Sequence, residues 1–205
     1  GMQAQEELDG TELERAKSAW LAARNAALEY LEEMQKIGLH KQIANRIIEP
    51  WKNITVIASS TFHNNFFKLR AHKDAQPEFQ YLAFLMKGLY ENHEPTFLQA
   101  GEWHLPYVFE EDRANFSIED LIKISTGRCA RVSYLTHDGR RDPRKDIELH
   151  NRLVTKEPGE PLHASPAEHI ARASDQWIRS GNFVGFFQYR KTLPIECALE
   201  YVEMR

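Results

Sequence analysis

Residues 59–83 hold the densest group of side chains that could do chemistry in this sequence. Amide, guanidinium and imidazole groups at Asn65, Arg70 and His72 interrupt an apolar pattern at helical spacing, formed by Phe62, Phe66 and Leu69. Polar groups in an apolar frame cost free energy unless they are hydrogen-bonded. The pattern predicts two short helices that meet at a polar elbow, a place suited to a flat, hydrogen-bonding ligand.

Four arginines lie in apolar or small-residue stretches instead of on plainly solvated faces: Arg46, Arg70, Arg131 and Arg190. Arginine is the usual choice where paired donors hold a phosphate or a planar heterocycle. The alternative is that each arginine pairs with an acidic neighbour, because structural ion pairs imitate binding sites. For any one arginine taken alone, the sequence leaves both interpretations open.

The motifs of several common enzyme classes are absent from the sequence, namely Gly-x-Ser-x-Gly, His-Glu-x-x-His, the phosphate-binding loop and the Rossmann glycine fingerprint. His163 and His169 have no standard metal spacing, and a capping role explains Glu168, so we expect no metal site. Cys197 has charged neighbours and could be a nucleophile, although a cysteine in a helix core is the simpler interpretation.

The first element that would position these residues is a long helix over residues 11–37. Thr11 and Glu14 form a capping box, and apolar residues recur at a helical period along the segment. Gly38 stands where a helix end favours a left-handed backbone. The length suits an arm for packing or oligomerisation, and its composition offers no chemistry.

The elements that lead into the elbow are a short helix over residues 40–48, stopped by Pro50, and a strand over residues 53–58. Thr61 is expected to cap the first elbow helix. The second elbow helix starts near residue 74, has Pro77 in its first turn and runs to about residue 92.

The middle of the chain starts with residues 93–116, which keep no regular period and include Gly-Glu-Trp-His-Leu-Pro-Tyr-Val. A long ordered loop is often functional, and a packed surface crossing is the alternative. Ser117, with Asp120 three residues on, is expected to cap the next helix. Another helix is predicted over residues 143–154.

The last third predicts a helix start at Ser165, with Pro166 at its first position and Glu168 at the capping-box position. A strand over residues 182–190 and a terminal helix over residues 193–202 follow. The predicted fold class is α+β: a small, mostly antiparallel sheet flanked by several helices, with a long N-terminal helix.

Bulk properties indicate one domain of ordinary globular type. The chain has 205 residues, 42% hydrophobic and 27% charged, a formal net charge of −4, and a pI near 6.2. It has no basic run for nucleic acid and no stretch of roughly 18 apolar residues for a membrane helix. We therefore expect that the protein binds neither nucleic acid nor membrane. Its two cysteines form no paired motif, so we expect a cytoplasmic location.

Three separate motifs resemble those of flavin-dependent thymidylate synthases. The stretch Asn-Asn-Phe-Phe-Lys-Leu-Arg-Ala-His-Lys-Asp-Ala-Gln-Pro-Glu-Phe resembles that family's segment with an Asn, then Leu-Arg, then Ala-Gln-x-Glu-Ile. Ala-Arg-Val-Ser at residues 130–133 resembles its Ala-Arg-Val-Ser, and His-Ala-Ser-Pro-Ala-Glu-His at 163–169 resembles its Ser-Pro-Phe-Glu-His. Their surroundings, about residues 40–90 and 120–190, cover more than half of the chain.

Two departures from the family pattern stand out. The Leu-Arg segment comes first here and last in the usual member, so the chain resembles a circularly permuted branch associated with phage genomes. The family signature Arg-His-Arg-x-x-Ser-x-Asn-Glu-x-Ser is only faintly matched by residues 188–196 and by nothing before residue 40. We therefore expect a truncated or split member. In the split case, an upstream reading frame would encode the missing N-terminal half.

The resemblance implies roles for residues that would bind substrate. Arg70 matches the arginine that binds the deoxyuridylate base and withdraws electrons from its carbonyl as carbon 5 reacts. Arg46 matches an arginine that contacts the nucleotide and its phosphate. Gln76 belongs to the matched Ala-Gln-x-Glu motif and counts as substrate-binding, although a role at a helix start explains it equally well.

The resemblance also implies flavin contacts. Asn65 matches a flavin-binding asparagine, and Ser133 matches a serine near the flavin. Asp74 stands where the family has a histidine that stacks on the flavin, so that contact is not expected here.

The implied reaction is reductive transfer of a one-carbon unit from methylenetetrahydrofolate to dUMP, giving dTMP. FAD would carry the hydride and NADPH would reduce the flavin. The resemblance implies a homotetramer with shared sites and a domain over residues 2–205, made of a helical arm (2–39), the elbow (40–92) and a part with the other two motifs (117–205). The alternative is a catalytically incomplete homologue that serves as a nucleotide-binding, flavin-binding or assembly subunit.

Overall fold

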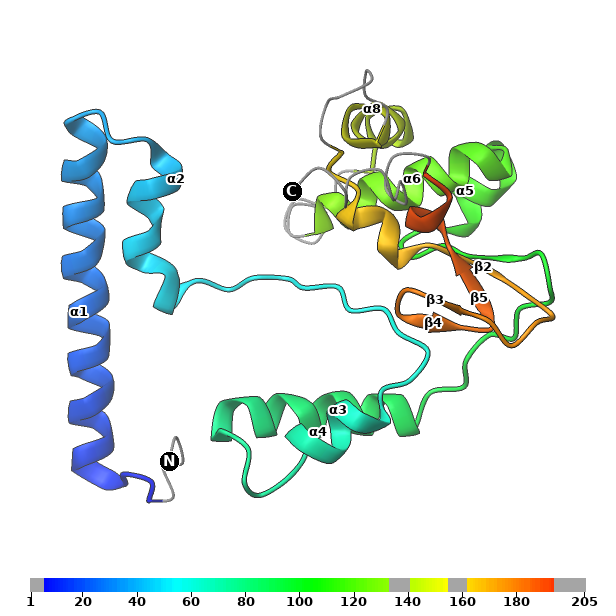
Figure 1. Cartoon of the computed structure of the whole chain (residues 1–205). Coiled ribbons are helices and arrows are strands. Elements are labelled where there is room, and N and C mark those ends of the chain that lie inside the picture. Colours follow the sequence, from blue (N-terminus) through cyan, green and yellow to red (C-terminus); the bar gives the residue numbers. More distant parts are fainter. Residues whose placement is uncertain (1–5, 133–140, 155–161, 194–205) are drawn as a thin grey trace, which may run out of the picture.

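The computed structural model describes residues 6–132, 141–154 and 162–193 of the chain. Its N-terminal part is a helical arm made of α1 (Gly10–Lys36), α2 (Lys41–Ala44) and the 3₁₀ helix η1 (Asn45–Trp51), with α2 and η1 lying back against α1 (Figure 1). The rings of Trp20 and Trp51 pack 5.2 Å apart and hold η1 to α1. The predicted long helix is therefore confirmed.

The ends of the arm helices differ in part from the prediction. Gly38 has φ +89°, the left-handed backbone expected after a helix. Thr11 does not cap α1, because Asp9 is the N-cap residue and makes no side-chain cap bond. The segment predicted as one short helix is α2 followed by η1, and η1 runs through Pro50 to Trp51.

The polar elbow consists of α3 (Asn64–Arg70) and α4 (Pro77–Glu91). Pro77 occupies the first turn of α4 as predicted, where its missing N–H would have no partner in any case. Phe67 is buried from α3, and its ring lies 5.4 Å from that of Tyr90 on α4. These contacts pack the two helices together.

Three further helices follow, α5 (Glu110–Asn115), α6 (Ile118–Ala130) and α8 (Pro143–Val154), and α6 supplies most of the main buried apolar cluster. Ser117 caps α6 as predicted, its Oγ accepting the backbone N–H of Asp120 at 3.3 Å. Helix α6 packs along α8. The buried apolar cluster around α6 contains Leu105, Leu121, Ile122, Ile124, Cys129 and Ile170.

The sheets are small and antiparallel. One has the order β1 (Trp103–His104), β2 (Ala171–Ala173), β5 (Phe186–Gln188), with Trp103 opposite Arg172 and Ala171 opposite Gln188. The other is a hairpin of β3 (Arg179–Ser180) and β4 (Phe183–Val184). Helices flank both sheets, so the predicted α+β class with a small antiparallel sheet is confirmed (Figure 1).

The structure differs from the prediction in two regions, the strand expected at residues 53–58 and the loop expected at residues 93–116. Residues 53–58 form no strand and run as an extended connection between η1 and the elbow (Figure 1). A strand is stabilised by its ladder partner, and Ile54 and Val56 are exposed instead, at 78% and 72%. Residues 93–116, predicted as a loop, contain β1 and α5. The predicted terminal helix lies almost entirely outside the described residues.

Candidate functional site

A cavity of about 610 Å³ lies where the elbow meets the second half of the chain. Residues 57–60 form one wall, α3 contributes another, and Met86 reaches in from α4. The opposite side comes from Glu168 and His169 of the 3₁₀ helix η2 (Ser165–His169) and from Asn182 in the β3–β4 turn. Segments more than 100 residues apart in the chain therefore line one space of small-molecule size.

Helix α3 presents a mixed face to this cavity. Asn65 and Leu69 are four residues apart, as are Phe66 and Arg70, so helical geometry puts all four on neighbouring positions of one side. Phe67 points away and is buried against α4. The lining thus alternates apolar surface with one amide and one guanidinium. The predicted apolar stripe is not the buried face, because Phe62 and Leu69 are exposed.

Arg70 supplies the positive charge of the cavity. Among the described residues that line it, Arg70 is the only lysine or arginine. Its guanidinium carbon lies 5.6 Å from the centre of the Phe79 ring, a cation–π arrangement that orients the side chain from α4. The side chain is solvent-exposed, which leaves it accessible to an incoming anion.

The extended wall is held in place by the β3–β4 hairpin. The hydroxyl of Thr61 accepts the N–H of Val184 at 2.9 Å, and the N–H of Thr61 donates to the carbonyl of Asn182 at 3.2 Å. The Ser60 hydroxyl donates to the same carbonyl at 3.3 Å. The prediction that Thr61 caps α3 is therefore wrong: its hydroxyl is used by the hairpin, and His63 is the N-cap residue.

His169 joins the two halves of the lining. Its Nδ1 lies 3.2 Å from Oγ of Ser59, and the tautomer decides which of the two donates. Burial lowers the pKa of His169, and the nearby Glu168 only partly opposes this shift. The imidazole is therefore neutral at pH 7 and offers one donor and one acceptor.

Glu168 has a different role from the predicted one. Its carboxylate accepts a hydrogen bond from Nη1 of Arg190 at 3.0 Å, across 22 residues of sequence. The helix start at Ser165 is a 3₁₀ helix of five residues with Ala164 as N-cap and no side-chain cap bond. The capping prediction is wrong, because a charged partner competes successfully for the carboxylate. Arg190 therefore pairs with an acidic residue, which was the alternative interpretation given for the four arginines.

The predicted site residues divide into two groups. Asn65 and Arg70 lie together in the cavity. Arg46, on η1 of the arm, and Gln76, the N-cap residue of α4, are exposed and do not line it. Ser133 lies outside the described residues.

Arg131 belongs to a buried ion network that the sequence did not predict. Its Nε donates to Asp146 Oδ1 at 2.7 Å, and Nε of Arg128 donates to Oδ2 of the same carboxylate at 2.9 Å. Arg128 also donates through Nη2 to Asp112 at 2.9 Å. Burial alone would raise the pKa of Asp112, but hydrogen bonds from Arg128 and from the backbone of Phe109 lower it overall. This network ties α5, α6 and α8 together.

One group that shapes the site was not singled out from sequence. This is Ser59, and the only signal was its place in the serine pair at the start of residues 59–83. Burial raises the pKa of the Cys129 thiol to about 12, which disfavours the reactive thiolate at neutral pH. Cys197 lies outside the described residues.

No protein-family model, curated protein or solved structure matches this chain. Within the described ranges, no three His, Cys, Asp or Glu side chains gather in a way that could hold a metal ion. None of the helices in those ranges combines the length and the apolarity needed to cross a membrane.

Proposed function

We propose that this chain is a flavin-dependent thymidylate synthase or a close relative, and that the 610 Å³ cavity binds a pyrimidine nucleotide. One observation carries the proposal. Asn65 and Arg70 come from one motif of the resemblance and Glu168 and His169 from another, and the four residues line one cavity although about 100 residues separate the motifs. Chance resemblance in short motifs gives no reason for the motifs to meet.

The chemistry of the lining suits deoxyuridylate. Arg70 offers paired N–H donors to a uracil carbonyl, where a positive charge would stabilise electron density that builds up during attack at carbon 5. Phe62, Phe66 and Ile57 provide apolar surface against a flat base. Neutral His169, held by Ser59, can exchange a hydrogen bond with a polar edge without adding charge.

FAD would supply the hydride for such a transfer, with methylenetetrahydrofolate and NADPH as co-substrates. The lining is chemically suited to the flavin ring, since Asn65 provides hydrogen-bond donor and acceptor groups beside the apolar side chains of Phe66 and Leu69. The chain's own part is to bind and orient the rings and to hold polar groups at their edges.

The experiment that tests the proposal is titration of the purified chain with dUMP. Arg70→Ala should weaken dUMP binding by roughly 10- to 150-fold, the loss of a hydrogen bond to a charged group. Lys68→Ala is the matched control, because Lys68 is a cation in the last turn of the same helix and does not line the cavity. FAD-loaded protein should also change its visible spectrum when dUMP is added.

Two outcomes would contradict the proposal. One is equal dUMP affinity in wild type and Arg70→Ala, with a large loss of thermal stability, which would make Arg70 structural. The other is colourless protein that neither binds FAD nor supports growth of a thymidine auxotroph. Binding of nucleotide or FAD without complementation would favour the alternative of an incomplete, ligand-binding subunit.

We also propose that the chain self-associates, in line with the tetramer that the resemblance implies. Large apolar side chains are exposed along α1 and α4, including Trp20, Tyr30, Phe79, Phe84 and Leu89. Light scattering after gel filtration should give a mass of at least twice that of the chain, and a monomer at micromolar concentration would refute this.

A further inference from the structure

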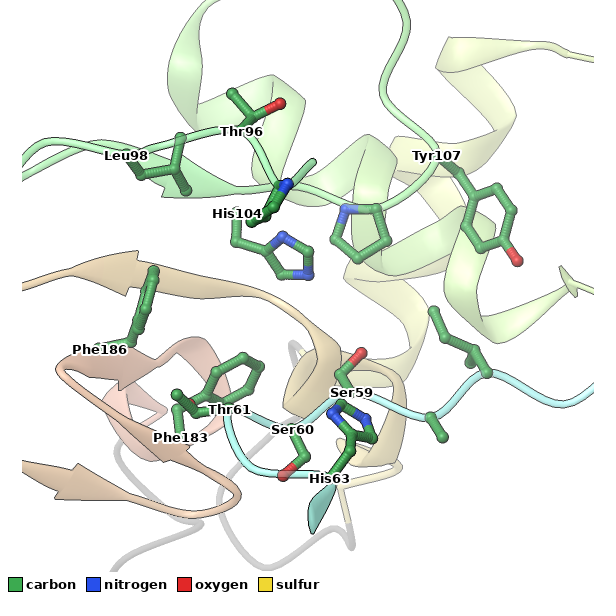
Figure 2. A pocket seen from close by; sticks show the side chains of 14 residues that line it. Ser59, Ser60, Thr61, His63, Thr96, Leu98, His104, Tyr107, Phe183 and Phe186 are labelled. Carbon is green, nitrogen blue, oxygen red and sulfur yellow. The ribbon is translucent and has the colours of Figure 1, made fainter. Parts of the chain in front are cut away.

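A second cavity, of about 520 Å³, adjoins the first at the extended wall. Residues 57–60 and His63 line both cavities, so the wall that bounds the nucleotide cavity also bounds this one. The rest of the second cavity comes from residues 95–107 and from the side chains of Phe183 and Phe186, which face the loop across the hollow (Figure 2).

The lining of the second cavity is chemically distinct from that of the first. Its described residues include no lysine, arginine, aspartate or glutamate. The apolar walls are aromatic and proline surfaces: the rings of Phe183 and Phe186 lie 6.0 Å apart, and Pro95, Leu98 and Pro106 face them. Flat apolar walls without charge favour an uncharged planar ligand over an anionic one.

The loop that forms this cavity is held in a strained conformation by buried groups. Tyr107 has φ +60°, the left-handed region that a residue with a Cβ rarely adopts. Its carbonyl accepts a hydrogen bond from Nη1 of Arg128 at 2.7 Å, and the carbonyl of Pro106 accepts one from Oγ of Ser125 at 2.7 Å. Arg128 and Ser125 are both buried in α6. Strain kept in place from the core is a feature of ligand sites.

Polar groups converge at the edges of the cavity. The ring of His104 points across the hollow towards the side of Ser59 and His63 (Figure 2). Burial lowers the pKa of His104, and the neighbouring His169 adds to this, so the ring is neutral and has one donor and one acceptor.

We propose that this second cavity binds an uncharged planar heteroaromatic ring between the aromatic wall of Phe183 and Phe186 and the loop of Pro106 and Tyr107. His104 hydrogen-bonds to a heteroatom at the ring edge. The ring lies beside the nucleotide cavity and shares the Ser59 wall with it, which brings two ligands next to each other. The inference rests on the cavity itself and stands whether or not the neighbouring cavity takes dUMP.

The test uses lumichrome, an uncharged fluorescent tricyclic ring without ribityl chain or phosphate. Wild-type protein should quench its fluorescence on binding, and Leu98→Trp should weaken binding at least 10-fold, because the indole fills the cavity that Leu98 lines. Leu89→Trp is the matched control, since Leu89 is 75% exposed on α4 and lies outside the cavity lining. It should bind lumichrome like wild type.

A second variant tests the polar edge. His104→Phe keeps a ring of similar size and removes both nitrogens, so lumichrome should bind about 2- to 12-fold more weakly. Leu98→Trp should leave dUMP affinity unchanged, because Leu98 does not line the nucleotide cavity, which separates this site from the nucleotide proposal. No binding to wild type, or equal binding to wild type and Leu98→Trp in folded protein, would overturn the inference.

Discussion

Asp146 is the residue whose replacement would test the buried ion network most sharply. Its carboxylate is fully buried and accepts Nε of Arg128 at 2.9 Å and Nε of Arg131 at 2.7 Å. Asp146→Asn keeps the size of the side chain, but one of its two oxygens becomes an NH₂ donor. One guanidinium donor would then face another donor, and Arg128 would keep Asp112 as its only nearby carboxylate among the described residues.

The magnitude follows from the burial of both partners. The Arg128 side chain is 1% exposed and that of Asp146 is 0% exposed, so solvent screens their attraction very little. Removing one partner of a buried pair leaves an uncompensated charge and costs about 3–5 kcal/mol. In a protein of this size that corresponds to a fall in melting temperature of about 6–20 °C.

The assay is thermal and urea unfolding followed by circular dichroism on the intact chain. Glu110→Gln is the control, since its side chain is 95% exposed and lies 3.9 Å from Arg113, an arrangement that contributes little to stability. It should leave the unfolding midpoint unchanged. If Asp146→Asn unfolds at the same temperature and urea concentration as wild type, the network does not stabilise the fold and the reasoning is wrong.

Two further predictions concern helix packing and pH. A Cβ on Gly127 would clash with the backbone oxygen of Asp146, so Gly127→Ala should destabilise the protein by about 1–3 kcal/mol in urea unfolding. Gly88 has open space around it, so Gly88→Ala should stabilise the protein by about 0.4–1 kcal/mol. The folded-state pKa values of His104 and His169 are lowered, chiefly by burial, so the unfolded chain takes up more protons below about pH 6.5. Stability should therefore fall as pH drops from 7 to 5, and an unchanged slope in His169→Gln would contradict this.

The parts of the fold that sequence predicted correctly depend on local chemistry. Ser117 caps α6 through a bond to a backbone N–H three residues away, Pro77 opens α4, and Gly38 takes positive φ after α1. Each of these follows from a few neighbouring residues. The predicted strand at residues 53–58 failed because β-branched alternation describes a candidate strand and not its ladder partner.

The same distinction between local and distant interactions separates the predictable parts of the site from the rest. The pairs Asn65–Leu69 and Phe66–Arg70 on α3 were predictable, because residues four apart on a helix are neighbours. The role of Glu168 was not, because the choice between capping and pairing with Arg190 is made by a residue 22 positions away. Likewise, the contact between Ser59 and His169 joins residues 110 positions apart, and no repeating pattern in the sequence predicts it.

The buried network and the second cavity are parts of one arrangement. Arg128 donates through Nε to Asp146 and through Nη1 to the carbonyl of Tyr107, so the same guanidinium that neutralises a buried carboxylate also holds the strained loop. A left-handed Tyr107 is retained only while surrounding groups outweigh its strain. Weakening the hydrogen bond between Arg128 and Asp146 should therefore increase the mobility of the loop that carries His104, even in protein that is still folded. The charge pair that stabilises the helices then also sets the shape of the cavity.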